Sequence, residues 1–178
     1  MFKRILVAVD GCPASIAGLR SALDVTNDQK ATLLAVHIID DGNLPINFEG
    51  AVYPPAVVDA YYVAAEKNGR KVLDRATTMA GRRGVKVTPL IVRSRLKTVA
   101  GAIVALARKH KADVIVLGTH GRRGLKRMLM GSDAEEVVRQ ALVPVLLVHE
   151  TYRAARKLRA AGVAASSTKP ASAARLAD

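Results

Sequence analysis

Short apolar runs alternate along the chain with longer segments in which apolar residues recur at helical spacing. The short runs are rich in Val, Ile and Leu, and several are nearly continuous, as is typical of strands covered on both faces. They are Ile5–Val9, Thr32–Ile39, Val85–Val92, Val114–Leu117 and Val143–Val148. Pro89 lacks the amide hydrogen that a central strand needs, so its run is predicted to lie at a sheet edge.

The segments between these runs carry the apolar stripes of amphipathic helices. The stripes are Ile16, Leu19 and Leu23; Ala65, Val72, Ala76 and Met79; Val99, Ile103 and Leu106; and Val137, Val138, Ala141 and Leu142. Gly69 lies inside the second stripe, where glycine costs about 1 kcal/mol relative to alanine. Alternation of strands and helices predicts βαβ units with right-handed crossovers. The expected fold is a single doubly wound α/β domain with a parallel sheet.

Two segments interrupt this pattern. Asp40–Val58 lacks periodicity and carries three prolines, so it is predicted to be a long loop. Loops of this length in a compact domain are often functional lids or mobile segments, and the sequence leaves open whether this one closes over a ligand. After Glu150 the chain becomes rich in Ala, Ser, Lys and Arg. We therefore expect a domain over residues 1–149 and a largely disordered basic tail over 150–178.

Composition and charge limit the classes of function. No apolar run reaches the roughly 20 residues needed to cross a bilayer. The one cysteine, Cys12, forms no disulfide within the chain, which favours a reducing cytoplasm. The net charge is +13, of which Thr151–Asp178 contributes +5, and the remaining +8 is spread over several segments. Four Tyr and two Phe do not alternate with the basic residues, so a base-stacking surface is not indicated.

The strand ends carry the residues with the clearest chemistry. In doubly wound sheets, ligands bind beyond the carboxyl ends of the strands, near the point where the strand order reverses. Asp10 and Gly11 follow the first strand, and a glycine-rich segment from Gly118 to Ser132 follows the fourth. Glycines let backbone amides approach phosphates, and the helix that opens near Ser132 offers further donors. This predicts a phosphate-binding loop, which is not a Walker A loop because no Gly-Lys follows at the required spacing.

The spacing Gly118-x2-Gly121-x9-Gly131-Ser132 resembles the nucleotide-binding signature of the universal stress protein family. The stretch Val114–Arg139 around it, the opening Lys3–Gly11 and the run Val143–Val148 also resemble that family. The resemblance covers roughly residues 1–149. One departure is the segment Arg93–Lys97, where many relatives have Gly-x-Pro before the third helix.

The resemblance implies a five-stranded parallel sheet of order 3-2-1-4-5 that binds ATP, with Mg²⁺ on the phosphates. It also implies a homodimer formed through Val143–Val148. By analogy, Asp10 contacts the ribose or adenine side, and the backbone of Ile38 meets the adenine. The nucleotide-binding residues implied are Asp10, Ile38, Gly118, Gly121, Arg122, Gly131 and Ser132.

Plainer interpretations stand beside these assignments. Ser132 and Glu135 have the spacing of a capping box, with Ser132 as the N-cap. Asp10 has the position of a residue that supports a turn. Arg122 and its basic neighbours either contact phosphate or form a solvated surface. Cys12, near a helix start, has either a lowered pKa or the role of a small, partly buried residue.

Two histidines lie at or just after the ends of predicted strands. His120 in the glycine loop is expected to be solvated, since no orienting partner is evident. His37, at the end of an apolar strand, is expected to be structural. No His and Cys spacing matches a metal site, and no catalytic constellation is recognisable.

The sequence therefore favours a cytoplasmic adenine-nucleotide-binding module of the stress response that signals through its occupancy. Two alternative functions remain open: a slow ATP hydrolase, and a nucleic-acid-associated protein that binds through its basic tail.

Overall fold

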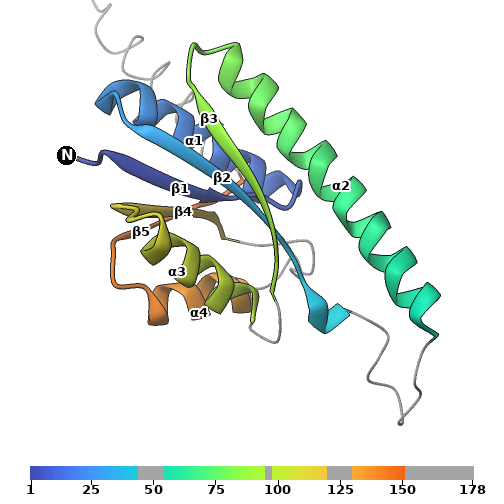
Figure 1. Ribbon diagram of the computed structural model, residues 1–178. Helices are drawn as coiled ribbons and strands as arrows, with labels where there is room; N and C mark the ends of the chain where they lie inside the picture. Colours follow the sequence, from blue (N-terminus) through green and yellow to red (C-terminus); the bar gives the residue numbers. More distant parts are fainter. Residues whose placement is uncertain (44–53, 95–97, 120–129, 151–178) are drawn as a thin grey trace, which may run out of the picture.

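Five parallel strands form one sheet in the order β3-β2-β1-β4-β5 (Figure 1). The computed structural model describes residues 1–43, 54–94, 98–119 and 130–150. The strands are β1 Arg4–Ala8, β2 Thr32–Ile39, β3 Val87–Arg93, β4 Val114–Gly118 and β5 Val145–Val148. The helices are α1 Pro13–Gln29, α2 Pro55–Gly81, α3 Val99–Lys109 and α4 Ser132–Gln140, with a 3₁₀ turn η1 at Asp41–Asn43. The predicted fold class and strand order are confirmed, and Pro89 lies on the edge strand β3.

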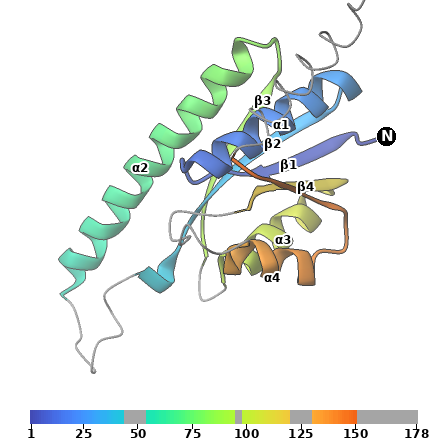
Figure 2. The ribbon, with the colours of Figure 1, turned by 180° about the vertical axis from the view of Figure 1, so that it is seen from behind.

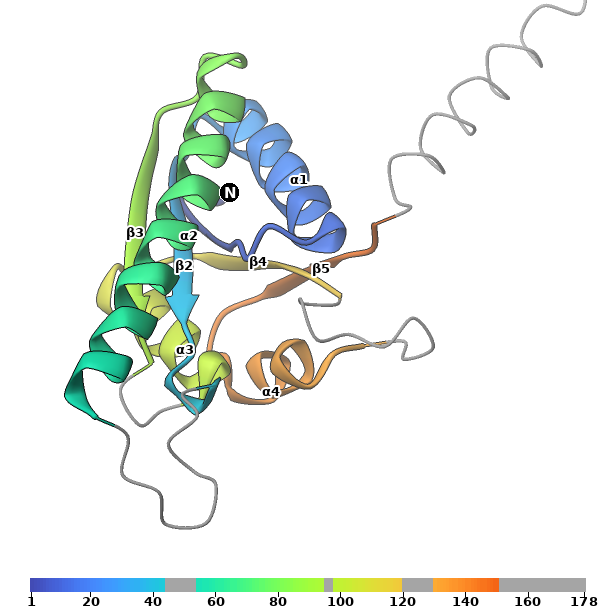
Figure 3. The ribbon, with the colours of Figure 1, turned by 90° about the vertical axis from the view of Figure 1, so that its right-hand side faces the viewer.

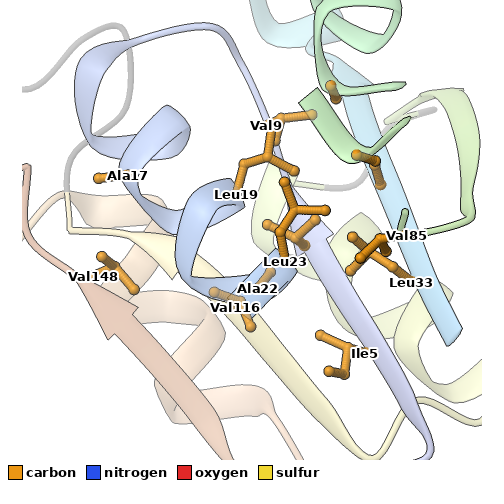
Figure 4. Close-up of a cluster of buried hydrophobic side chains, with 14 of the residues drawn as sticks. Ile5, Val9, Ala17, Leu19, Ala22, Leu23, Leu33, Val85, Val116 and Val148 are labelled. Atoms are coloured by element: carbon orange, nitrogen blue, oxygen red, sulfur yellow. The ribbon is translucent and has the colours of Figure 1, made fainter. Parts of the chain in front are cut away.

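The helices form a layer on each face of the sheet (Figures 2 and 3). Strand β1 carries apolar side chains on both faces of the sheet. Ile5 and Val7 pack under α1 and α2, while Leu6 packs with the residues of α3 and α4. All three side chains are at most 1% exposed. Figure 4 shows the first of these clusters, in which Leu19 and Leu23 of α1 lie against Ile5, Val9 and Leu33. A strand that is buried on both faces is apolar at every position, which is the pattern that identified it.

Several sequence predictions about element boundaries are wrong. Strands β3 and β5 each begin two residues later than predicted, at Val87 and Val145. The predicted loop Asp40–Val58 includes the first turn of α2, which begins at Pro55 with Pro54 as its N-cap. A proline suits the first helical position, because the amide hydrogen that it lacks would have no partner there. The fourth helix ends at Gln140, so Leu142 lies beyond it and is 82% exposed.

Gly69 has a packing reason to lie inside α2. A β-carbon at this position would lie 2.7 Å from Cδ2 of His37 on β2. His37 is 5% exposed, and its Nδ1 lies 2.7 Å from the carbonyl oxygen of Val9, which can only accept a hydrogen bond. The glycine therefore lets α2 approach a buried histidine whose Nδ1 proton is bound to the end of β1, and His37 has the predicted structural role.

Candidate functional site

The candidate site lies at the carboxyl edge of the sheet, where β1 and β4 are neighbours. From β1 the chain turns to β2 on one side, and β4 lies on the other side, so this is the point where the strand order reverses. In doubly wound folds such a point opens a crevice between the loops that follow the two strands. Here those loops start at Val9–Cys12 and at Thr119, and the start of α4 faces the same edge.

Asp10 forms a tight turn that leads from β1 into α1. One carboxylate oxygen of Asp10 accepts a hydrogen bond from the Cys12 amide at 2.9 Å. The buried hydroxyl oxygen of Ser15 accepts from the amides of Asp10 (3.3 Å) and Gly11 (3.1 Å). Gly11 has φ of +88°, a conformation that L side chains rarely adopt. The turn-forming role of Asp10 is confirmed, and Ser15 is a supporting residue that the sequence analysis missed.

Cys12 is the N-cap of α1 and uses its sulfur as the capping acceptor. The Ser15 amide donates to Sγ at 3.3 Å, and the side chain is partly buried. Burial, together with a hydrogen bond to Asp10, raises the pKa of the thiol. A lowered pKa, one of the two sequence interpretations, is therefore wrong, because desolvation and a neighbouring carboxylate both disfavour the thiolate. The interpretation of Cys12 as a small, partly buried residue is confirmed.

Gly118, at the end of β4, is required by packing. A β-carbon there would lie 2.5 Å from the carbonyl carbon of Ala14 and 2.7 Å from the amide nitrogen of Ser15. Gly18 in α1 makes the reciprocal approach, since its β-carbon would lie 3.2 Å from the Gly118 amide nitrogen. The first turns of α1 thus rest directly on the end of β4. This contact brings the Asp10 turn and the start of the glycine loop together.

A backbone hydrogen bond closes the segment between β4 and α4. The Gly131 amide donates to the Thr119 carbonyl oxygen at 2.8 Å, and the Thr119 amide donates to the Val148 carbonyl oxygen at 3.0 Å. Gly131 is extended, with φ of −78° and ψ of 151°, and is the N-cap of α4. The predicted capping box is therefore wrong, because the N-cap is Gly131, which has no side chain to cap the helix, and Ser132 is already the first helical residue.

The start of α4 offers backbone donors together with two acidic side chains. The first helical bond runs from the Glu135 amide to the Gly131 carbonyl oxygen at 3.0 Å. The amides of Ser132, Asp133 and Ala134 therefore have no acceptor within the helix, as at any helix start. Asp133 and Glu135 lie in this first turn and already complement the positive end of the helix dipole.

Ile38 lies where β2 extends beyond β1. The β1–β2 register ends at Ala8 and Val36, whereas the β2–β3 register continues to Ile39 and Arg93. The carbonyl oxygen of Val36 accepts from the Val9 amide, so it faces β1. Backbone groups two residues apart in a strand face the same side, so the N–H and C=O of Ile38 also point toward the β1 side. They face the switch point, beyond the last paired residue of β1.

The remaining predicted loop residues, Gly121 and Arg122, lie outside the described residues, as does His120. Of the predicted set, the structure gathers Asp10, Gly118, Gly131 and Ser132 around the ends of β1 and β4. Among the described residues, no group of three or more His, Cys, Asp or Glu side chains is placed to hold a metal ion.

A polar cluster at the ends of β2 and β3 was not predicted. The Tyr62 hydroxyl donates to Asp41 at 3.1 Å, and the Arg93 guanidinium lies 3.9 Å from the centre of the Tyr62 ring. Arg93 also forms a 2.9 Å ion pair with Glu66. The Asp41 amide donates to the buried hydroxyl of Ser94 at 3.0 Å. Arg93 and Ser94 therefore tie β3 to α2 and to the chain that leaves β2.

A cavity of about 380 Å³ lies beside the Asp10 turn, between α1 and α2. Gly11, Cys12, Ile16 and Val72 line it, with Lys71 and Arg75 on its rim. It shares Gly11 and Cys12 with the turn, although it lies on the face covered by α1 and α2.

The chain matches the model of the universal stress protein family over residues 1–149. It is similar to the universal stress protein MJ0531 of Methanocaldococcus jannaschii, with 30% identity over 151 residues that cover 83% of this chain and 82% of the relative. It is also similar to the crystal structure of a universal stress protein family member from Burkholderia pseudomallei. That likeness has 33% identity and a TM-score of 0.64, and covers 82% of this chain and 95% of the other.

Two more distant structures share the fold and contain nucleotides. One is a universal stress protein in complex with cAMP, with 21% identity, a TM-score of 0.60, and coverage of 84% and 98%. The other, from Archaeoglobus fulgidus, is in complex with dAMP, with 21% identity, a TM-score of 0.57, and coverage of 82% and 97%. The described helices of the present chain include none with the length and hydropathy of a membrane span.

We predict that Gly118→Ala lowers the free energy of unfolding by about 1–3 kcal/mol or more, because the new methyl group meets backbone atoms that have no room to shift. Gly131→Ala should cost about 1 kcal/mol, because the backbone angles of Gly131 suit alanine and only a weaker N-cap results. Urea unfolding followed by circular dichroism measures both. Equal costs for the two variants would show that Gly118 is not a packing residue.

We predict that alkylation of Cys12 by iodoacetamide has a pH midpoint above that of the same thiol in the urea-unfolded chain. The thiolate is the reactive form, and the folded environment disfavours it. The pH midpoint reports the pKa of the thiol, whereas poor access of iodoacetamide to Cys12 would change the rate and not the midpoint. The signal comes from one residue, because the chain has one cysteine. A folded-state midpoint at or below the unfolded one would contradict the burial argument.

Proposed function

Because the chain belongs to the universal stress protein family, we propose that it binds an adenine nucleotide, ATP above all, at the β1/β4 switch point and acts as a stress-response signalling module. Occupancy of the site would act through different affinities of the nucleotide for two conformations of the protein. We propose the cytoplasm as its compartment, on the strength of the lone Cys12.

The observation that carries the proposal is that β2 continues past its last residue paired with β1, so that the backbone N–H and C=O of Ile38 face the switch point. A backbone N–H and C=O that point from one residue to the same side can pair with an acceptor and a donor of an adenine edge. Such a pair recognises the base without any particular side chain. The cAMP and dAMP complexes of proteins with the same fold support an adenine nucleotide as the ligand.

The roles of the other residues follow from their positions. Asp10, held in its turn by Ser15, would accept hydrogen bonds from the ribose hydroxyls. Gly121, Arg122 and the exposed hydroxyl of Ser132 would meet the phosphates, with Mg²⁺ held by phosphate oxygens. Gly118 and Gly131 would act mainly by shape, because Gly118 packs on α1 and the Gly131 amide donates to Thr119.

We also propose a homodimer formed through Val143–Val148. Strand β5 is an edge strand, and an uncovered edge favours pairing with another chain. Leu142 (82%), Val138 (45%) and Leu146 (40%) on and beside this strand are exposed large apolar side chains. A second copy would cover them.

Calorimetric titration of the full chain with Mg-ATP tests the nucleotide site, and we expect one ATP bound per chain. Gly131→Val should weaken binding at least tenfold, because a branched side chain would keep phosphates away from the backbone at the start of α4, while φ of −78° suits valine. Lys67→Gln, on the exposed face of α2, is the control and should bind like the original chain. Titrations with AMP and cAMP rank the ligands. Absence of binding heat and of any melting-temperature increase with all three nucleotides would refute the proposal.

Sedimentation velocity tests the dimer. Leu146→Arg places a charge on the outer strand and should shift the chain from dimer to monomer. Val63→Arg is the matched control, since Val63 is 68% exposed on α2, away from β5. A monomeric original chain at micromolar concentration, or a dimer that tolerates Leu146→Arg, would exclude this interface.

A further inference from the structure

The net positive charge of the first 150 residues is concentrated in five short segments. Residues 1–4, 28–31, 82–86, 108–113 and 139–144 together contain ten Lys and Arg residues, against Asp28 and Asp113 as the acidic ones. The rest of the first 150 residues contains equal numbers of basic and acidic residues, twelve of each. Four of the segments connect a helix to the next strand, and the fifth leads into β1.

The fold brings these segments to one edge of the sheet. All the strands are parallel, so their amino ends share an edge, which is opposite the candidate nucleotide site. The labelled N-terminus lies at this edge (Figure 1). Side chains that are separate in sequence become neighbours here, and we call the surface formed by the five segments the basic edge.

Hydrogen bonds join several of the segments. The amides of Lys3 and Arg4 donate to one oxygen of Asp113 at 2.7 and 2.8 Å, and the Arg4 side chain donates to the Lys111 carbonyl oxygen at 2.6 Å. These amides lower the pKa of Asp113, so its negative charge is already engaged by the backbone. The Thr32 amide, just after the second segment, donates to the Lys3 carbonyl oxygen at 2.9 Å. The segments 1–4 and 108–113, and the start of β2 after residues 28–31, are thus held together.

Helix dipoles explain only part of this charge. Cations in the last helical turn stabilise the negative end of a helix. Arg108 and Lys109 do so in α3, and Arg139 does so in α4, but α1 and α2 have no basic residue in their last turns. Ion pairs engage Arg83 with Asp24 and Arg139 with Glu135. Lys3, Lys30, Lys86 and Lys109, from four different segments, are exposed.

We propose that the basic edge binds the phosphate backbone of double-stranded nucleic acid without sequence preference. Neighbouring strands lie about 4.8 Å apart, so five strands spread the cations over roughly 19 Å. A duplex presents evenly spaced charge, about one per 1.7 Å of axis, and suits such a spread better than a compact anion does. The tyrosine pair Tyr61 and Tyr62 lies at the opposite edge of the sheet, so stacking on bases is not available from it. Phosphate contact alone carries no sequence information.

Fluorescence anisotropy with a labelled 25-base-pair duplex at several salt concentrations tests the proposal on the full chain. The edge variant replaces Lys3, Lys86 and Lys109 with Gln and Lys30 with Asn, which tolerates the φ of +52° at that position. The control variant replaces Lys67, Arg70, Lys71 and Arg75, exposed on α2, with Gln. Both variants lose the same charge and keep the same tail. Circular dichroism melting confirms that both are folded.

The edge variant should bind at least tenfold more weakly at 0.1 M salt, and the slope of log K against log salt should be shallower by about 3.6, since each of four lost phosphate contacts accounts for about 0.9. The control variant should stay within twofold of the original chain. Equal loss in both variants, unchanged affinity in the edge variant, or no duplex binding by the original chain at low salt would each overturn the proposal. Tighter binding to vesicles with anionic lipid, lost in the same edge variant, would assign the edge to a membrane surface instead. Mg-ATP affinity of the edge variant should be unchanged, which keeps this result separate from the nucleotide site.

Discussion

The close contact between the first turns of α1 and the end of β4 determines the rest of the carboxyl edge. Gly18 and Gly118 meet with no side chain between them, so a helix and a strand approach at backbone distance. The Asp10 turn, which is the entrance to α1, is thereby fixed beside the start of the glycine loop. The pairing of β1 with β4 makes neighbours of two strand ends that are more than 100 residues apart in sequence, and the two glycines let α1 pack against the end of β4 at the candidate site.

Patterns that depend on local physics were predictable from the sequence. Strands buried on both faces had to be continuously apolar, and Pro89 could only lie on an edge strand. Element boundaries that depend on residues distant in the sequence were not predictable. Ser132 had the spacing to Glu135 of a capping box, but the N-cap is Gly131, whose amide donates to the distant Thr119 carbonyl oxygen, and the helix begins at Ser132. The prolines at 54 and 55 were assigned to a loop, yet the same residues are suited to begin a helix.

The glycines show a different limit of sequence reasoning. A glycine in a phosphate-loop motif was explained by access of the ligand to the backbone, and Gly118 turned out to have a packing role that needs no ligand. The charge distribution is similar. Along the sequence the basic residues are spread over several segments, and only the parallel topology shows that five segments with a combined charge of +8 share one edge. In both cases the missing information was which distant segments are neighbours.

The extension of β2 past β1 affects how a base-binding site of this kind can evolve. An adenine base that pairs with the backbone of Ile38 would occupy the place of one more β1 residue. It would make the hydrogen bonds that such a residue would otherwise make to β2. Recognition would then be encoded in strand length rather than in residue identity. The side chain at position 38 could drift among apolar residues over long divergence, while a single-residue lengthening of β1 would close the site at once. Relatives that have lost the nucleotide should therefore be sought among length changes near Val9 as much as among substitutions in the glycine loop.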